Sequence, residues 1–275
     1  MMLSPAATVV ILAFAGLFGL VIGSFLNVVV YRVPAGVPLT RESRCPQCGA
    51  PVRPWHNVPV ASWLLLRGGC ADCGERISAR YPLVELATGA FFVLVTWSAL
   101  QAAVPASGAD AIVLVAYLYF AAITVALTLI DLDTHRLPNA IVLPSYAVAG
   151  ILFVLAAAVG GRWSSLLTAA VGGAVLYAFY FVLRAIKPGG MGGGDVKLAG
   201  VVGIYLGWLG WGALIVGAFA AFLLGGVFGI ALILARRAGR KSAIPFGPWM
   251  LAGAWVGIFA GQALADWYMG LFAIA

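Results

Sequence analysis

Charged residues are scarce in this chain. Only 9% of its 275 residues are Asp, Glu, Lys or Arg, whereas 63% are hydrophobic. Soluble domains carry about 25% charged residues, so this composition excludes an ordinary soluble protein and indicates a membrane protein. With nine acidic residues and two histidines in the whole chain, every carboxylate and imidazole can be assessed individually as a candidate site residue.

The sequence also has no basic segment at its start, so we expect no cleavable signal peptide. What it has instead is long apolar runs, and a membrane-spanning helix needs about 20 apolar residues. These runs predict an all-α polytopic membrane protein with about eight transmembrane helices. The sixth run is short and glycine-rich, and seven spans would result if residues 196–235 were divided differently. The predicted spans lie near residues 6–30, 83–104, 111–130, 140–159, 164–184, 196–208, 211–235 and 246–268.

Basic residues are distributed unevenly between the predicted loops. Residues 31–80 hold seven of the 16, and Lys and Arg are retained on the cytoplasmic side. This loop is therefore predicted to be cytoplasmic, with the N-terminus outside. The same topology places every other basic residue except Arg162 on the cytoplasmic side. This asymmetry, together with attraction to anionic lipid, explains the net charge of +7. The charge therefore does not require that the protein binds nucleic acid. The other cytoplasmic basic residues are Arg136, Arg184, Lys187, Lys197, Arg236, Arg237, Arg240 and Lys241.

We accordingly expect three parts. A first transmembrane helix occupies residues 1–30, a cytoplasmic loop domain residues 31–80, and a transmembrane catalytic bundle residues 81–275.

Two aspartates stand out within the bundle. Asp131 follows the apolar run VALTLI, and Asp195 ends the glycine-rich stretch of GGMGGGDVK (189–197). The predicted topology puts both at cytoplasmic ends of spans, and ionisable residues at membrane depth are costly and usually functional. Two carboxylates held close together share a proton, so that one can take a proton from water while the other donates to a scissile carbonyl. We therefore predict that Asp131 and Asp195 form the catalytic pair of an aspartic protease.

The glycines before Asp195 allow two interpretations. Backbone without side chains would let an extended peptide approach the carboxylate. Alternatively, the stretch is a flexible turn in which Asp195 caps the next helix, with Lys197 among the lipid headgroups.

The remaining acids and histidines are expected to be structural or surface residues. Asp133 lies two positions from Asp131 and so points to a different face of a helix; we expect it at the interface near Arg136. Glu85 follows Pro82 in the first turn of the second span, where an acid stabilises a helix N-terminus. Solvated or surface positions are expected for Asp110, Asp266, His56 and His135.

The four cysteines form two C-x-x-C pairs, CPQC (45–48) and CADC (70–73), each followed by glycine. This spacing is close to the zinc-ribbon pattern, and four thiolates suit tetrahedral Zn²⁺. Because thiols stay reduced in the cytoplasm, a disulfide is the less favoured alternative. Sulfur fills all four positions, so the metal would be structural. The predicted ligands are Cys45, Cys48, Cys70 and Cys73.

These motifs occur in order along the chain and together resemble one family. With GSFLNVVVYRVP (23–34), the cysteine loop, ISARYPLVELATG (77–89), LIDLDTHRLPN (129–139), GGGDVKL (192–198) and IPFGPWMLAGA (244–254), the chain resembles the type IV prepilin leader peptidases, which are membrane aspartic proteases of the GxGD type. The motif positions of that family mark Asp131 and Asp195 as catalytic and the four cysteines as a zinc tetrad.

The resemblance implies an eight-span enzyme of the bacterial inner membrane, with its active site facing the cytoplasm. Such an enzyme removes the leader peptide from type IV prepilins and pseudopilins, and so serves a type IV pilus or type II secretion. It then N-methylates the new N-terminus with S-adenosylmethionine. The sequence has no Rossmann-type methyltransferase fingerprint, so the methyl-donor site is not placed; residues 31–80 are its expected neighbourhood.

Two other classes of protein compete with this interpretation. An ion-coupled membrane transporter could also use buried carboxylates and glycine-rich discontinuous helices, but the two aspartates are predicted at one membrane face and no inverted repeat is visible. A scaffold whose zinc loop recruits partners would leave the aspartate pair unexplained.

Overall fold

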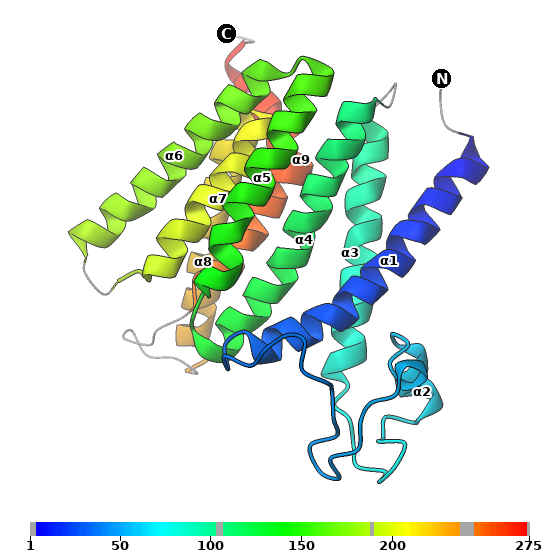
Figure 1. The fold of residues 1–275 in the computed structure, drawn as a ribbon. Helices are drawn as coiled ribbons and strands as arrows, with labels where there is room; N and C mark the ends of the chain where they lie inside the picture. Colours follow the sequence, from blue (N-terminus) through cyan, green and yellow to red (C-terminus); the bar gives the residue numbers. More distant parts are fainter. Residues whose placement is uncertain (1–3, 103–106, 188–189, 237–244, 274–275) are drawn as a thin grey trace. The chain divides into compact units, whose positions relative to one another are not determined.

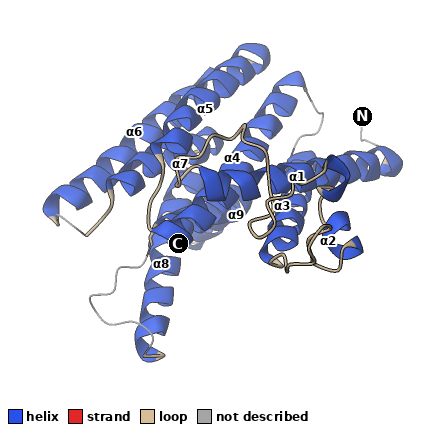
Figure 2. Ribbon diagram, turned by 60° about the horizontal axis from the view of Figure 1, so that its bottom comes forward, coloured by secondary structure: helices blue, strands red, loops and turns tan. Residues whose placement is uncertain are grey.

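The computed structural model describes residues 4–102, 107–187, 190–236 and 245–273, and the regular secondary structure in this part of the chain is helical (Figure 1). Figure 2 shows helices joined by loops, with no strand among the described residues. The helices are α1 (Pro5–Arg32), η1 (Pro54–His56), α2 (Ala61–Leu65), α3 (Arg80–Ala102), α4 (Gly108–Thr134), α5 (Asn139–Gly160), α6 (Trp163–Ile186), α7 (Gly193–Leu209), α8 (Trp211–Leu234) and α9 (Gly247–Ala273).

Seven of the described helices are long and apolar enough to cross a membrane: α1, α3, α4, α5, α6, α8 and α9. The polytopic all-α fold is thus confirmed, as is the cysteine-bearing loop between the first and second spans. The expected number of about eight spans becomes seven full-length candidates and one shorter helix, α7. Its 17 residues extend over about 25 Å, less than the roughly 30 Å of a hydrocarbon core.

The short helix α7 ends for a local reason. Gly210 has φ +121° and ψ 179°, a conformation open only to glycine, and it separates α7 from α8. Eleven of the 17 residues of α7 are buried, because α5, α6, α8 and α9 all pack against it. Protein contacts therefore cover α7 along most of its length.

Glycines set the close approach of these helices. A Cβ at Gly203 of α7 would overlap the backbone of Gly172 in α6, and one at Gly253 of α9 would overlap Ala221 of α8. Small residues at such crossings let backbones approach, which is how helices gain packing energy in a membrane.

The described residues form two compact units. One comprises residues 4–102 with Tyr117–Ala126, and the other comprises Ser107–Ala116 with the residues from Leu127 onward. In the first unit α1 packs along α3. There the buried Arg32, at the end of α1, donates to the carbonyl oxygen of Leu39 at 2.9 Å and to Ser43 Oγ at 3.1 Å, which ties the start of the loop to the helix.

Candidate functional site

The four cysteines, in the first unit, converge on one point. Their sulfur atoms all lie within 4.8 Å of one another. The two C-x-x-C turns are alike: Gly49 has φ +71° and donates to the carbonyl of Cys45 at 3.0 Å, while Gly74 has φ +73° and donates to the carbonyl of Cys70 at 2.9 Å. Glycine is required after each pair because a side chain is strained at such a φ.

The spacing and electrostatics of this cluster fit a metal. Tetrahedral Zn²⁺ with bonds of about 2.3 Å places its sulfur ligands about 3.8 Å apart, and the sulfurs of Cys45 and Cys73 are 3.8 Å apart. The backbone N–H groups of Cys48 and Gln47 lower the pKa of Cys45 to about 7. At Cys73 the backbone N–H of Glu75 acts in the same direction, but the neighbouring thiols outweigh it and raise the pKa to about 12. A bound cation would offset the repulsion among four thiolates held this close together.

Asp131 belongs to the second unit and lies in the last turn of α4, where only 4% of the residue is exposed. Its Oδ2 accepts a hydrogen bond from the backbone N–H of Gly247, the first residue of α9, at 3.1 Å. A Cβ at Gly247 would lie 2.6 Å from the same oxygen. The carboxylate therefore sits against the positive end of α9, a favourable position for negative charge.

Asp195 lies in the first turn of α7, in the same unit. Its Oδ2 accepts from the backbone N–H of Gly192 at 3.0 Å, so part of the capping role that was the alternative interpretation is present. Its carboxylate also interacts electrostatically with Asp131 and with the buried Tyr180. The structure thus brings together the two predicted aspartates, from the end of α4 and the start of α7. Asp131 is buried and Asp195 is half-buried, and the sharing of one proton between them stays a prediction.

Each described glycine beside Asp195 has a close neighbour. A Cβ at Gly194 would lie 2.8 Å from Leu137 Cβ, and a Cβ at Gly193 would lie 2.7 Å from a guanidinium nitrogen of Arg184. The glycines thus admit side chains from the α4–α5 loop and from α6. Leu137 also reaches to 3.3 Å from a Cβ at Gly247, so it contacts the backbone around both aspartates.

Several other expectations can be compared with the structure. Asp133 is exposed, unlike Asp131. Glu85 was expected to stabilise the N-terminus of its own helix. Its Oε2 instead makes a structural contact with the loop, where it accepts from the backbone N–H of Val60 at 2.7 Å. The expectation that Asp110 is merely solvated is wrong, because Asp110 caps α4 and pairs with Arg162 at 2.5 Å.

The two histidines and Asp266 were also expected to be surface or solvated residues. His135 is exposed as expected, but it also has φ +53° and ends α4 by donating its N–H to the carbonyl of Asp131 at 2.9 Å. Asp266 is exposed and accepts from Gln262 at 2.9 Å. His56 is half-buried. Arg237, Arg240 and Lys241 lie outside the described residues.

The sequence analysis did not identify the hydrogen-bond donors of the two carboxylates. The Gly247 N–H donates to Asp131 and the Gly192 N–H to Asp195, and Leu137 lies close to Gly247. The available signal was that all three of these neighbours lie within the motifs LIDLDTHRLPN, GGGDVKL and IPFGPWMLAGA.

Fold and site together define a polytopic membrane protein with two little-exposed aspartates in one unit and a four-cysteine cluster in the other. Residues 17–99 match the bacterial peptidase A24 N-terminal domain, and residues 118–230 match the type IV leader peptidase family. The chain belongs to the type IV prepilin leader peptidase family.

Curated relatives agree along nearly the whole chain. Prepilin leader peptidase/N-methyltransferases of Aeromonas salmonicida and Neisseria gonorrhoeae are each 36% identical, covering 92% and 93% of both chains respectively, and that of Pseudomonas putida is 34% identical over 91% of both. No solved structure gave a significant match.

Proposed function

We propose that this chain is a membrane aspartic endopeptidase that removes the leader peptide from type IV prepilins and pseudopilins, with N-methylation of the new N-terminus as a second activity. The observation that carries the peptidase assignment is that Asp131 and Asp195 lie near one another, since Leu137 lies close both to Gly194 and to Gly247, in a member of the leader peptidase family. The transporter alternative has no comparable support, since the relatives are named for peptidase and methyltransferase activities.

The proposed chemistry uses the two carboxyl groups in turn. With one proton shared between them, the ionised carboxylate takes a proton from a water molecule, whose oxygen attacks the scissile carbonyl carbon. The protonated carboxyl group donates to the carbonyl oxygen. The carboxyl group that took the water proton then delivers it to the leaving nitrogen as the C–N bond breaks, and the other carboxylate takes a proton from a hydroxyl of the intermediate, which restores the starting pair. The Gly247 N–H would keep Asp131 oriented through this cycle.

For the four-cysteine cluster we propose structural Zn²⁺ held by Cys45, Cys48, Cys70 and Cys73. The sulfur separation at one edge of the cluster and the glycine-terminated turns support this metal. Zinc would supply folding energy to a small polar loop rather than chemistry, because sulfur occupies all four coordination positions.

The proposed methyl donor is S-adenosylmethionine. Two acidic groups of the loop already have partners: Glu42 pairs with Arg44 at 2.7 Å and Asp72 with Arg53 at 3.1 Å. We assign no residue to the donor, and residues 31–80 remain the proposed neighbourhood of its site.

The distribution of basic residues supports a location in the bacterial inner membrane, with the N-terminus outside and both the aspartate pair and the zinc loop facing the cytoplasm. The proposed partners are prepilins, pseudopilins and the lipid bilayer, without nucleic acid.

A cleavage assay tests the proposed function. Purified protein in liposomes is incubated with a type IV prepilin, with and without S-adenosylmethionine, and the product is weighed by intact mass spectrometry. We expect a shortened product that gains one methyl group only with the cofactor. Cleavage without added mass would remove the methyltransferase assignment, and no cleavage of any prepilin or pseudopilin would contradict the peptidase assignment.

A further inference from the structure

Two side chains tie α5 to α7 close to Asp195. The Tyr146 hydroxyl, on α5, donates to the carbonyl oxygen of Lys197 at 2.6 Å. The Lys197 ammonium donates in turn to Oδ1 of Asn139, the first residue of α5, at 2.9 Å. Lys197 follows Asp195 by two positions, so both contacts fall within the first two turns of α7. They fix the end of α7 that carries the carboxylate.

The packing around this tie is specific. A Cβ at Gly200 would overlap the Tyr146 hydroxyl, so the tyrosine reaches the Lys197 carbonyl only because residue 200 has no side chain. On the other side of Asp195, Leu137 packs into the space left by Gly194. One stretch of chain, residues 137–146, therefore holds α7 on both sides of Asp195.

The same stretch follows Asp131 closely in the chain. It begins six residues after Asp131, and His135 closes the intervening turn by donating its N–H to the Asp131 carbonyl. The helix end that carries Asp131 and the helix end that carries Asp195 are thus connected by a short, hydrogen-bonded path.

We propose that Tyr146 and Lys197 are positioning residues that set Asp195 opposite Asp131. This inference rests on the proposed aspartic peptidase function. The short helix α7 depends on its protein neighbours for its position, and the reacting groups of an enzyme tolerate little displacement: a shift of about 1 Å can cost about 10²-fold in rate. Loss of either contact should lower kcat and leave KM unchanged, because neither side chain is proposed to touch the substrate.

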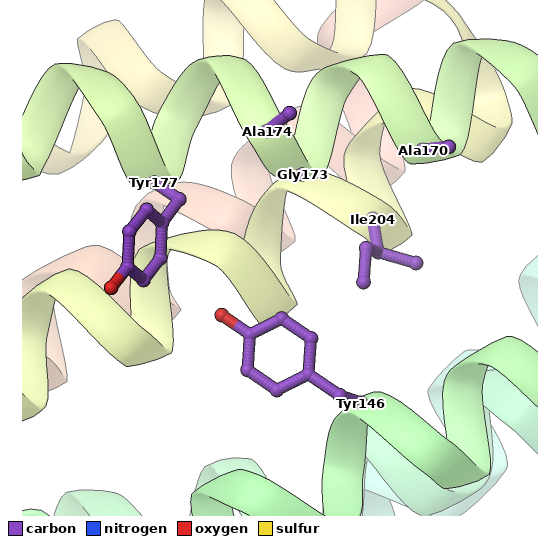
Figure 3. Close-up of a pocket in the computed structure, with 6 residues that line it drawn as sticks. All are labelled: Tyr146, Ala170, Gly173, Ala174, Tyr177 and Ile204. Atoms are coloured by element: carbon purple, nitrogen blue, oxygen red, sulfur yellow. The ribbon is translucent and has the colours of Figure 1, made fainter.

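Tyr177 provides a matched control for Tyr146 (Figure 3). Tyr146 from α5 and Tyr177 from α6 line the same largely apolar cavity of about 400 Å³. Tyr177 is 42% exposed, and within the described part of the chain its hydroxyl makes no hydrogen bond. Tyr177→Phe therefore removes the same atom from the same cavity without breaking the tie.

The first test is steady-state cleavage of a type IV prepilin in liposomes. We expect Tyr146→Phe and Lys197→Met to lower kcat by roughly tenfold or more, with KM unchanged and Tyr177→Phe like wild type. Lys197→Arg should restore most of the rate, because a guanidinium can still donate to Asn139. Wild-type kcat in Tyr146→Phe, or equal losses in Lys197→Arg and Lys197→Met, would overturn the inference. Full activity of Asp195→Asn would instead contradict the proposed function.

A second test does not depend on activity. Amide hydrogen exchange reports local opening, so exchange in residues 195–201 should be faster in Tyr146→Phe than in wild type or Tyr177→Phe. Equal protection in all three proteins would show that the tyrosine hydroxyl does not hold the start of α7.

Discussion

Asp131 and Gly247 lie 116 positions apart in the chain and meet through a hydrogen bond of 3.1 Å, from the glycine N–H to the carboxylate Oδ2. This contact joins the end of α4 to the start of α9 and buries the carboxylate against a helix N-terminus. It leaves room for no side chain at position 247, since a Cβ there would lie 2.6 Å from Oδ2.

Gly247→Ala should therefore displace the Asp131 carboxylate and lower prepilin cleavage by at least about tenfold. Gly226→Ala is the matched control, because a Cβ at Gly226 of α8 would meet nothing within 4 Å. Initial rates for the two purified variants check this prediction. Equal rates in both would show that the contact does not orient Asp131.

The close contact of Gly200 with Tyr146 predicts a non-additive pair of substitutions. Gly200→Ala should destabilise the protein, because the new methyl group overlaps the tyrosine hydroxyl. In Tyr146→Phe that hydroxyl is absent, so adding Gly200→Ala should cost less than it does in wild type. A double-mutant cycle of thermal unfolding in detergent measures the coupling. Strictly additive shifts in Tm would contradict the observed packing.

Metal removal should loosen the loop selectively. We expect one zinc per chain, lost in Cys70→Ser, and faster tryptic cleavage at the exposed arginines of residues 41–80, because the metal supplies much of the folding energy of such a loop. Chelation of the wild-type protein should have the same effect, and zinc should restore protection. A metal-free wild-type protein with a protease-resistant loop would contradict a structural zinc site.

Glu85 is expected to stabilise this loop through its hydrogen bond with Val60. Val60 has φ +61°, unusual for a β-branched residue, and its N–H donates to the buried Glu85 carboxylate at 2.7 Å. Glu85→Ala should destabilise the loop by about 1–3 kcal/mol and speed exchange of the Val60 amide. Glu85→Gln keeps an acceptor oxygen and should have a smaller effect. Equal effects of both substitutions would indicate that the hydrogen bond is not the cause.

The sequence predicted most of what depends on local patterns. Apolar runs located the spans, and the C-x-x-C-Gly repeats located the cysteine cluster, because both signals lie within short segments. The aspartates were identified because few ionisable residues exist in this chain. The short sixth run was also visible in the sequence, but its exact end was less accessible, since it depends on Gly210 adopting φ +121°. The contacts of Gly247 with Asp131 and of Tyr146 with Lys197 join residues far apart in sequence, and no spacing rule identifies such partners.

The most direct test of the central claim is the cleavage rate of Asp131→Asn and Asp195→Asn beside the matched control Asp133→Asn. Asp133 lies two residues from Asp131 but is exposed. We predict that each of the first two substitutions lowers cleavage of a prepilin by about 10²–10⁴-fold, in protein that remains folded and retains its zinc, while Asp133→Asn cleaves like wild type. Wild-type cleavage by either Asp131→Asn or Asp195→Asn would contradict the carboxylate pair as the catalytic centre.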